Sequence, residues 1–195
     1  MEDGINEAGS SLASRLAALE DVSAIQALKW RYLRACDRKQ PEVVADCFTA
    51  DAVIDYEGFP LFTSGEAFAQ AFARLGCQPH IIDMHHGQNP IVELVAPDRA
   101  LGWFDCFFFQ IDADSARLTQ LAVSYDDTFV RRDDRWLIAR TVSRRISMLV
   151  QEIGEDAVAR VRVAARSDAP GPPPGARMTD STWGGRVTPV RDGGC

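Results

Sequence analysis

The chain has 195 residues, with 28 acidic and 21 basic side chains and a formal net charge of −7. This length favours one domain with extensions, and a hydrophobic content of 46% is enough to build a core. The acidic balance argues against nucleic acid or an anionic membrane surface as the main partner. No stretch approaches the roughly 18 apolar residues of a membrane span, and the polar N-terminus is unlike a signal peptide. We therefore expect a cytoplasmic protein.

The cysteines and histidines argue against metal sites and disulfides. Five cysteines are present without a Cys-x-x-Cys pair, and such an odd set fits a reducing compartment. The three histidines lack the His-x-His or His-x-x-x-His spacing of common metal ligands. We expect neither a metal nor another cofactor.

The first part of the chain predicts helices. Residues 1–10 are polar and are expected to be disordered. Apolar side chains then recur at steps of three and four over residues 11–36, which predicts a helix with one apolar stripe. Asp21 or Ser23 is expected to break this helix and cap a second one. Pro41 suits the first turn of the next helix, and a further helix is expected from Ser64 to its stop at Gly76.

The second part of the chain predicts strands. A short strand is expected at residues 51–56, and four longer ones at 84–95, 100–111, 118–131 and 135–150, joined by short polar turns. Helices followed by such a meander predict an α+β domain over residues 11–151, with helices covering one face of a curved antiparallel sheet. Residues 152–166 are expected to form a further helix, and the Pro/Gly-rich residues 167–195 a flexible tail.

Side-chain alternation in the strand at 100–111 predicts two covered faces. Phe104, Cys106 and Phe108 share one face, whereas Trp103 and Phe107 share the other. Helices can cover only one of these apolar faces. A second subunit is expected on the other, so the sequence predicts a homo-oligomer, either a dimer or a trimer.

Several segments together resemble the SnoaL-like branch of the NTF2-like superfamily. The order and separation of these segments carry the resemblance, which covers about residues 15–150: AIQALKWRY at 24–32, DRK at 37–39, MHHG at 84–87 followed by Pro90, and residues 125–136. Within the branch the sequence is most similar to the bile-acid 7α-dehydratases, and more distantly to γ-hexachlorocyclohexane dehydrochlorinases and scytalone dehydratases. The resemblance implies a cone of helices packed on a strongly curved antiparallel sheet.

The resemblance also implies a set of catalytic residues. The family's tyrosine, aspartate, histidine and arginine fall on Tyr32, Asp37, His85 and Arg145. Its second aspartate falls on Phe108, which departs from the bile-acid pattern. Each of the four polar residues also has a structural interpretation: Asp37 as a helix terminator, His85 as a satisfied core histidine, Tyr32 as core packing, and Arg145 as half of a surface ion pair.

These residue types fit proton abstraction from carbon. An imidazole titrates near ~6.5 and suits a general base, and a carboxylate such as Asp37 would fix the tautomer of His85. Tyr32 would donate a hydrogen bond to a carbonyl oxygen or a leaving hydroxyl, and Arg145 would bind an enolate or a substrate carboxylate. The apolar lining is expected to come from Phe104, Cys106, Phe108, Trp30 and Tyr56.

We therefore expect a cofactor-independent lyase of dehydratase type, acting on a hydrophobic, cyclic small molecule in secondary metabolism. Isomerisation and polyketide cyclisation use the same base and pocket and remain open. A non-catalytic binding or assembly module is the rival interpretation, because a fold does not fix a function.

Overall fold

The computed structural model describes residues 2–153, and for residues 2–10 it describes only the helical backbone. The helices are α1 (Glu2–Asp37), α2 (Pro41–Asp46) and α3 (Gly65–Leu75). The strands are β1 (Phe48–Tyr56), β2 (Ile81–Ala96), β3 (Arg99–Asp112), β4 (Arg117–Arg132) and β5 (Arg135–Glu152). From residue 154 onward, the predicted C-terminal helix and tail lie outside the described residues.

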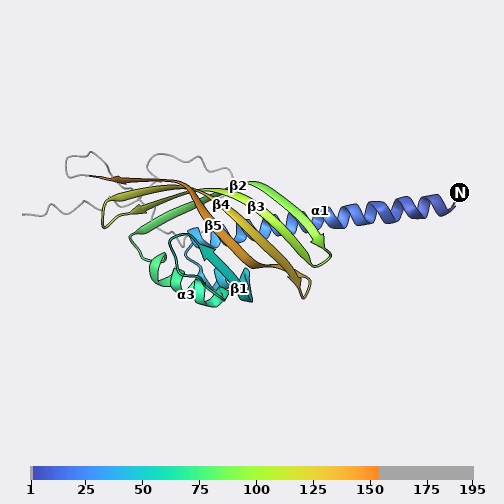
Figure 1. The fold of residues 1–195 in the computed structure, drawn as a ribbon, viewed down its shortest axis with the longest axis horizontal. Coiled ribbons are helices and arrows are strands. Elements are labelled where there is room, and N and C mark those ends of the chain that lie inside the picture. The colour runs from blue at the N-terminus through green and yellow to red at the C-terminus, as the bar shows by residue number, and fades with distance from the viewer. Residues whose placement is uncertain (1, 154–195) are drawn as a thin grey trace, which may run out of the picture. The chain divides into compact units, whose positions relative to one another are not determined.

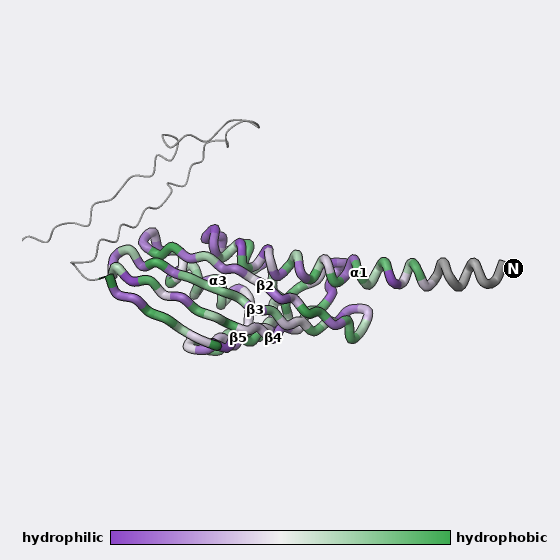
Figure 2. Tube along the Cα trace, turned by 90° about the horizontal axis from the view of Figure 1, so that it is seen from above, coloured by the Kyte–Doolittle hydropathy of each residue, from purple (hydrophilic) through white to green (hydrophobic). Residues whose placement is uncertain are grey.

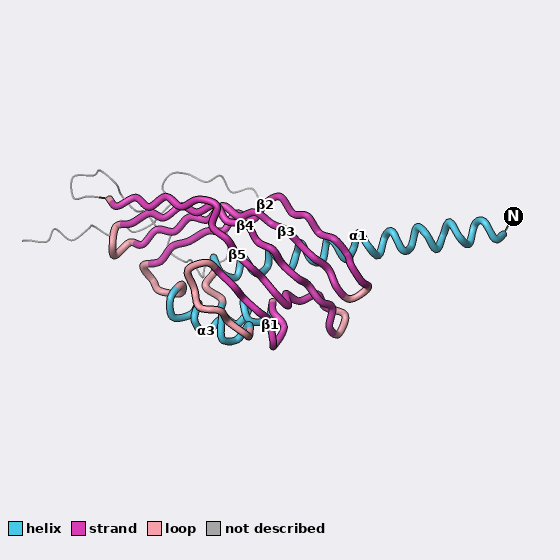
Figure 3. The backbone as a smooth tube through the Cα atoms, in the orientation of Figure 1, coloured by secondary structure: helices cyan, strands magenta, loops and turns pink. Residues whose placement is uncertain are grey.

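The five strands form one sheet in the order β1-β5-β4-β3-β2, visible as the magenta layer of Figure 3. Strands β2 to β5 are an antiparallel meander, as the short polar turns predicted. Strand β1 instead pairs in parallel with β5, with Ile54 opposite Thr141. The α+β fold is thus confirmed, and β2 is left as an edge strand beside the end of α1.

The helices cover one face of the sheet, here called the inner face, as the two views of Figures 1 and 2 agree. Ile25 of α1, Ile54 of β1, Phe129 of β4 and Ile138 of β5 are each 0% exposed. Burying side chains of this size stabilises the fold by about 1.5–3 kcal/mol each. The core therefore lies between the helices and the inner face.

Helix α1 differs from its prediction in two ways. It begins at Glu2 rather than near residue 11, and it continues without a break past residues 20–23. Asp21 does not act as a cap: it accepts a hydrogen bond from Trp136 Nε1 at 3.0 Å and pairs with Arg131. Asp21 therefore bonds to residues of the sheet and does not end the helix.

The predicted apolar stripe of α1 is buried only in its second half. Ile25, Leu28 and Tyr32 are buried, whereas Leu12, Leu16 and Leu19 are 66%, 55% and 68% exposed. Figure 1 shows why: the first half of α1 projects beyond the sheet. The sheet covers the helix only near its C-terminal end.

The other face of the sheet, here called the outer face, carries exposed aromatic side chains. Trp103 and Phe107 are 38% and 40% exposed, whereas Phe104 and Cys106 on the inner face are each 2% exposed. The predicted alternation of β3 is therefore confirmed. The second subunit expected on the outer face stays a prediction.

Candidate active site

Asp37 is the last residue of α1, and a left-handed turn ends the helix directly after it. Lys39 has φ of 56°, Gln40 N donates to Ala35 O at 3.0 Å, and Lys39 N donates to Cys36 O at 3.1 Å. These two hydrogen bonds form a Schellman motif, which satisfies carbonyls that the helix end leaves open. The chain turns away here, so the Asp37 side chain is free to reach the neighbouring strand.

His85 lies on the inner face of edge strand β2, opposite Phe108 of β3. Gly87, two residues along, shares this face and allows α1 to approach closely. A Cβ atom at Gly87 would lie 2.2 Å from Trp30 Cζ3 and 2.7 Å from Leu33 Cδ1. The glycine therefore sets how near the end of α1 comes to His85.

The predicted pair of Asp37 and His85 is in direct contact in the structure. Asp37 Oδ1 lies 2.7 Å from His85 Nδ1 and also accepts the backbone N–H of His85 at 2.9 Å. A carboxylate oxygen accepts, so this contact keeps a proton on Nδ1 and leaves Nε2 with a lone pair. The side chains are 20% and 15% exposed, so the pair is sheltered but open to solvent.

An aromatic ring supports the imidazole from β3. The ring centroids of His85 and Phe108 are 4.7 Å apart, with a tilt of 51°. Phe108 is half-buried. It occupies the position at which the resemblance places a second aspartate, so the surface beside the base is apolar in this chain.

The two other β3 residues predicted to line a pocket lie within the core. Phe104 packs edge-on against Trp30 with centroids 5.7 Å apart, and also against Phe129 at 6.1 Å. Cys106 is equally buried, and burial raises the pKa of its thiol to about 11. Trp30 and Tyr56 are packed against the same core and are partly buried. The half-buried Phe108 is therefore the β3 residue nearest to an open site.

Tyr32 points away from the pair and towards β1. Its hydroxyl lies 2.8 Å from the hydroxyl of Tyr56, and its ring packs edge-on against Phe48 at 5.4 Å. Tyr32 is 2% exposed, and burial raises the pKa of its hydroxyl well above the ordinary value. The structure thus joins Tyr32 with Tyr56 rather than with His85.

Arg145 shares the inner face with His85 but lies across the sheet from it. The register aligns Gly87, Cys106, Val123 and Arg145 in one row over four strands. Three strand spacings correspond to about 14 Å. The Nε atom of Arg145 lies 3.4 Å from Glu57 Oε1, and its Nη1 atom donates to the sulfur of Met148 at 3.8 Å. The structure therefore does not bring Arg145 together with the pair, and its predicted role remains a prediction.

Two polar residues close to the pair lie on the opposite face of the sheet. His86 lies on the outer face, where its ring stacks on Phe109 with centroids 6.3 Å apart. Asp105, also on the outer face, accepts a hydrogen bond from Asn89 at 2.8 Å. Neither residue reaches His85.

Two buried ion pairs near the inner face were not predicted from the sequence. Lys39 pairs with Asp83, and the two side chains are 8% and 5% exposed. Lys29 lies 2.7 Å from Asp127, with both side chains 0% exposed. The sequence could have placed Asp83 beside the site, because Asp83 and His85 are two residues apart in one strand and so share a face.

Other features of the described residues do not extend the site. A surface hollow of about 270 Å³ is lined by Pro41, Glu42, Glu66, Ala69, Gln70 and Ala73, none of which was predicted as a site residue. In the part of the chain that the structure describes, no three His, Cys, Asp or Glu side chains gather as metal ligands. Within that same part, no helix is long and apolar enough to cross a membrane.

Comparison with known proteins places these observations in a family. Residues 17–142 match the SnoaL-like domain. No curated protein sequence matches the chain. Among solved structures, a protein assigned as a scytalone dehydratase from Novosphingobium aromaticivorans is similar over 68% of this chain and 89% of its own, with 21% identity and a TM-score of 0.63.

Two hexachlorocyclohexane dehydrochlorinases are similar to the same extent. The type 2 enzyme has 23% identity and a TM-score of 0.65 over 74% of this chain and 97% of its own. The type 3 enzyme from Novosphingobium barchaimii has 23% identity and a TM-score of 0.64, over 70% of this chain and 94% of its own. At such identities the likeness establishes the fold and leaves the reaction to be argued from the site.

Proposed function

This chain belongs to the SnoaL-like domain family, and we propose that it is a cofactor-independent lyase of dehydratase type acting on a hydrophobic small molecule. The observation that carries this proposal is the 2.7 Å contact of Asp37 Oδ1 with His85 Nδ1. This contact leaves Nε2 of the partly exposed His85 imidazole able to accept a proton. Dehydratases and dehydrochlorinases, the enzymes named among the similar folds, both eliminate a proton together with a leaving group.

The proposed reaction begins with proton transfer from carbon to His85 Nε2. The electrons of the broken C–H bond form a carbon–carbon double bond as the neighbouring C–O bond breaks. The departing oxygen takes the electron pair of that bond and a proton, and leaves as water. His85 supplies that proton from Nε2, so the imidazole returns to its starting state.

Asp37 supports the charge that His85 acquires in this reaction. The imidazolium is stabilised by the adjacent carboxylate, and the hydrogen bond to Nδ1 holds the ring in place while Nε2 works. A charge-assisted hydrogen bond of this kind contributes about 1.5–3 kcal/mol. Phe108 supplies an apolar wall beside the ring, which favours a hydrophobic, cyclic substrate.

The activity is best tested with a panel of cyclic β-hydroxy carbonyl compounds. Loss of water is measured by mass spectrometry and by the absorbance of the conjugated product. His85→Ala and Asp37→Ala are each expected to lower kcat/KM by about 10²–10⁴-fold. His86→Ala is the matched control, because it removes the adjacent imidazole from the opposite face of the same strand. Near-normal turnover by His85→Ala would exclude this residue as the base.

The same base also fits isomerisation or polyketide cyclisation, and the product mass distinguishes these reactions from dehydration. An isomer keeps the substrate mass, whereas a dehydrated product is lighter by one water.

One observation favours a non-catalytic module instead. Phe104 and Cys106, which were expected to line a pocket, are each 2% exposed within the core. A module of this kind binds hydrophobic compounds from the panel without converting them. Binding that His85→Ala leaves unchanged, with no product formed by the wild-type protein, would support this function and overturn the lyase.

A further inference from the structure

We propose that Lys39 and Asp83 are a positioning pair that fixes the geometry and balances the charge of the Asp37–His85 pair. The catalytic consequence of this proposal rests on the proposed function, whereas its effect on His85 can be measured in the resting protein.

The two pairs lie side by side between the same two segments. Lys39 follows Asp37 by two residues at the end of α1, and Asp83 precedes His85 by two residues on β2. Residues two apart in a strand share a face, so Asp83 and His85 both point from β2 towards the end of α1. Two contacts then join the segments, from Asp37 to His85 and from Lys39 to Asp83.

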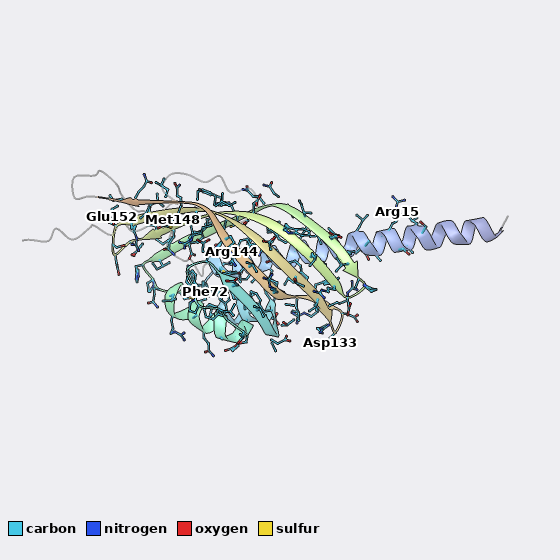
Figure 4. All side chains as sticks on the ribbon, viewed as in Figure 1. Arg15, Phe72, Asp133, Arg144, Met148 and Glu152 are labelled. Carbon is cyan, nitrogen blue, oxygen red and sulfur yellow. The ribbon has the colours of Figure 1, made fainter. Side chains whose placement is uncertain are left out.

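The second contact is the more deeply buried one. The side chains of Lys39 and Asp83 are 8% and 5% exposed, against 20% and 15% for Asp37 and His85. The Lys39 ammonium also lies 5.9 Å from the ring centroid of Phe72, a residue of α3 that Figure 4 labels. A buried charge requires a partner, so Lys39 and Asp83 hold each other in one arrangement.

The backbone at Lys39 points to a role for its side chain. Lys39 adopts φ of 56°, at the position of a Schellman motif that glycine fills most readily. A lysine there carries a steric cost that glycine would avoid. The side chain offsets this cost by reaching Asp83 from the residue at which the chain reverses.

Removing either partner would leave one unpaired charge beside the imidazole. The ionisable groups near the pair include Arg38, which lies between Asp37 and Lys39 in the sequence, and the thiols of Cys36 on α1 and Cys106 on β3. Burial raises the pKa of both thiols, so they are neutral at pH 7. An isolated Lys39 cation disfavours the imidazolium form of His85, whereas an isolated Asp83 anion favours it. The two single substitutions must therefore act on His85 in opposite directions.

The test follows the ring of His85 in the full-length protein by NMR, using ¹⁵N-labelled histidine and His85→Gln to assign its signals. Asp83→Asn is expected to lower the pH midpoint of His85 titration, and Lys39→Met to raise it, each by about one pH unit. The double variant Lys39→Met/Asp83→Leu should lie near the wild-type midpoint. Arg34→Met is the control, because it removes an exposed cation from the same helix end and should move the midpoint by less than about 0.2 units.

Lys39→Gly is a second variant that keeps the test decisive if Lys39→Met does not fold. It removes the same charge as Lys39→Met while suiting the left-handed backbone, so it should raise the midpoint in the same direction. Shifts of both single variants in one direction, or no shift in either, would overturn the proposal.

Turnover then separates this proposal from the proposed function. If a substrate is found, the acid limb of the kcat/KM profile should move with the midpoint in each variant. If the panel yields no product at all, the lyase fails, and opposite shifts of His85 still support the positioning pair. A pH–rate profile that stays fixed while the His85 midpoint moves would show that the Lys39–Asp83 pair does not affect catalysis.

Discussion

The Lys29–Asp127 and Asp37–His85 pairs have the same 2.7 Å separation but lie in different surroundings. Lys29 and Asp127 lie in the core with both side chains 0% exposed, whereas Asp37 and His85 lie at its margin with 20% and 15% exposed. The ammonium of Lys29 also lies 3.6 Å from the ring centroid of Tyr125 and 5.4 Å from that of Phe104. Aromatic rings surround the first pair, whereas the second keeps part of its surface open to solvent.

This difference in burial fits a structural role for the first pair and the proposed chemical role for the second. A buried ion pair loses the hydration of both charges, so the pair as a whole contributes little net stability. A partly exposed imidazole, with Nδ1 bonded to a carboxylate and Nε2 free to accept, could exchange a proton with a bound molecule. A short distance alone therefore does not identify an active site, because the enclosed pair has the same separation.

The strongest test of this contrast removes one partner of the enclosed pair. Lys29→Met leaves Asp127 as an unpaired charge in the core and is expected to lower the free energy of unfolding by about 3–5 kcal/mol. Urea denaturation followed by circular dichroism measures this change. Lys29→Met/Asp127→Leu should recover most of the loss, and a double variant no more stable than the single one would contradict the account.

A second test opens the contact between α1 and β2 near the exposed pair. Gly87→Ala places a Cβ atom 2.2 Å from Trp30 Cζ3. We expect this overpacking to lower the free energy of unfolding by about 1–3 kcal/mol. Thermal unfolding measures the loss, and the exposed Gln88→Ala on the same strand is the control. Unchanged stability in Gly87→Ala would mean that α1 has room to shift.

A smaller effect on stability is expected at the exposed pair itself. Asp37→Asn keeps an oxygen that can accept the His85 backbone N–H, so the free energy of unfolding should fall by about 1 kcal/mol or less. Under the proposed function the same variant loses most of its turnover. A loss of stability as large as that of Lys29→Met would place Asp37 with the structural pair.

The smallest effect concerns acid stability. Burial favours the neutral form of Asp21, but hydrogen bonds from Trp136 and Arg131 outweigh it and hold the pKa of this carboxyl below its ordinary value of 3.8. A depressed carboxyl pKa stabilises the fold above the unfolded value, and this contribution disappears as the pH falls through the folded pKa. The melting temperature of Asp21→Asn should therefore approach that of the wild type below about pH 3.8 and lie below it at pH 7. A constant difference across this range would exclude a role for the Asp21 charge.

The sequence predicted those parts of the fold that depend on local pattern. Alternation along the chain identified the four strands of the meander and the inward side of Phe104. The parallel pairing of β1 with β5 joins segments far apart in the chain, and no local pattern specifies it. Likewise, Asp21 has the residue type of a helix cap, and only the approach of Trp136 from β5 gave it another partner.

The candidate site was predictable where family spacing and strand parity agreed. Asp37 and His85 meet as expected. The family spacing also placed Arg145 in the last strand, but spacing along the chain does not report how far apart two strands of a sheet lie. Lys39 was missed because a lysine beside a helix end is normally solvated, and its burial depends on the left-handed turn that directs it to Asp83.

The His85 backbone N–H donates to Asp37 on the side of β2 that has no partner strand. Strand β2 is at the border of the sheet, and an unpaired border strand offers its amides as a template on which another chain can aggregate. At His85 this template position is occupied by the carboxylate of Asp37. Asp37 therefore removes one of the amides through which another strand could pair with β2.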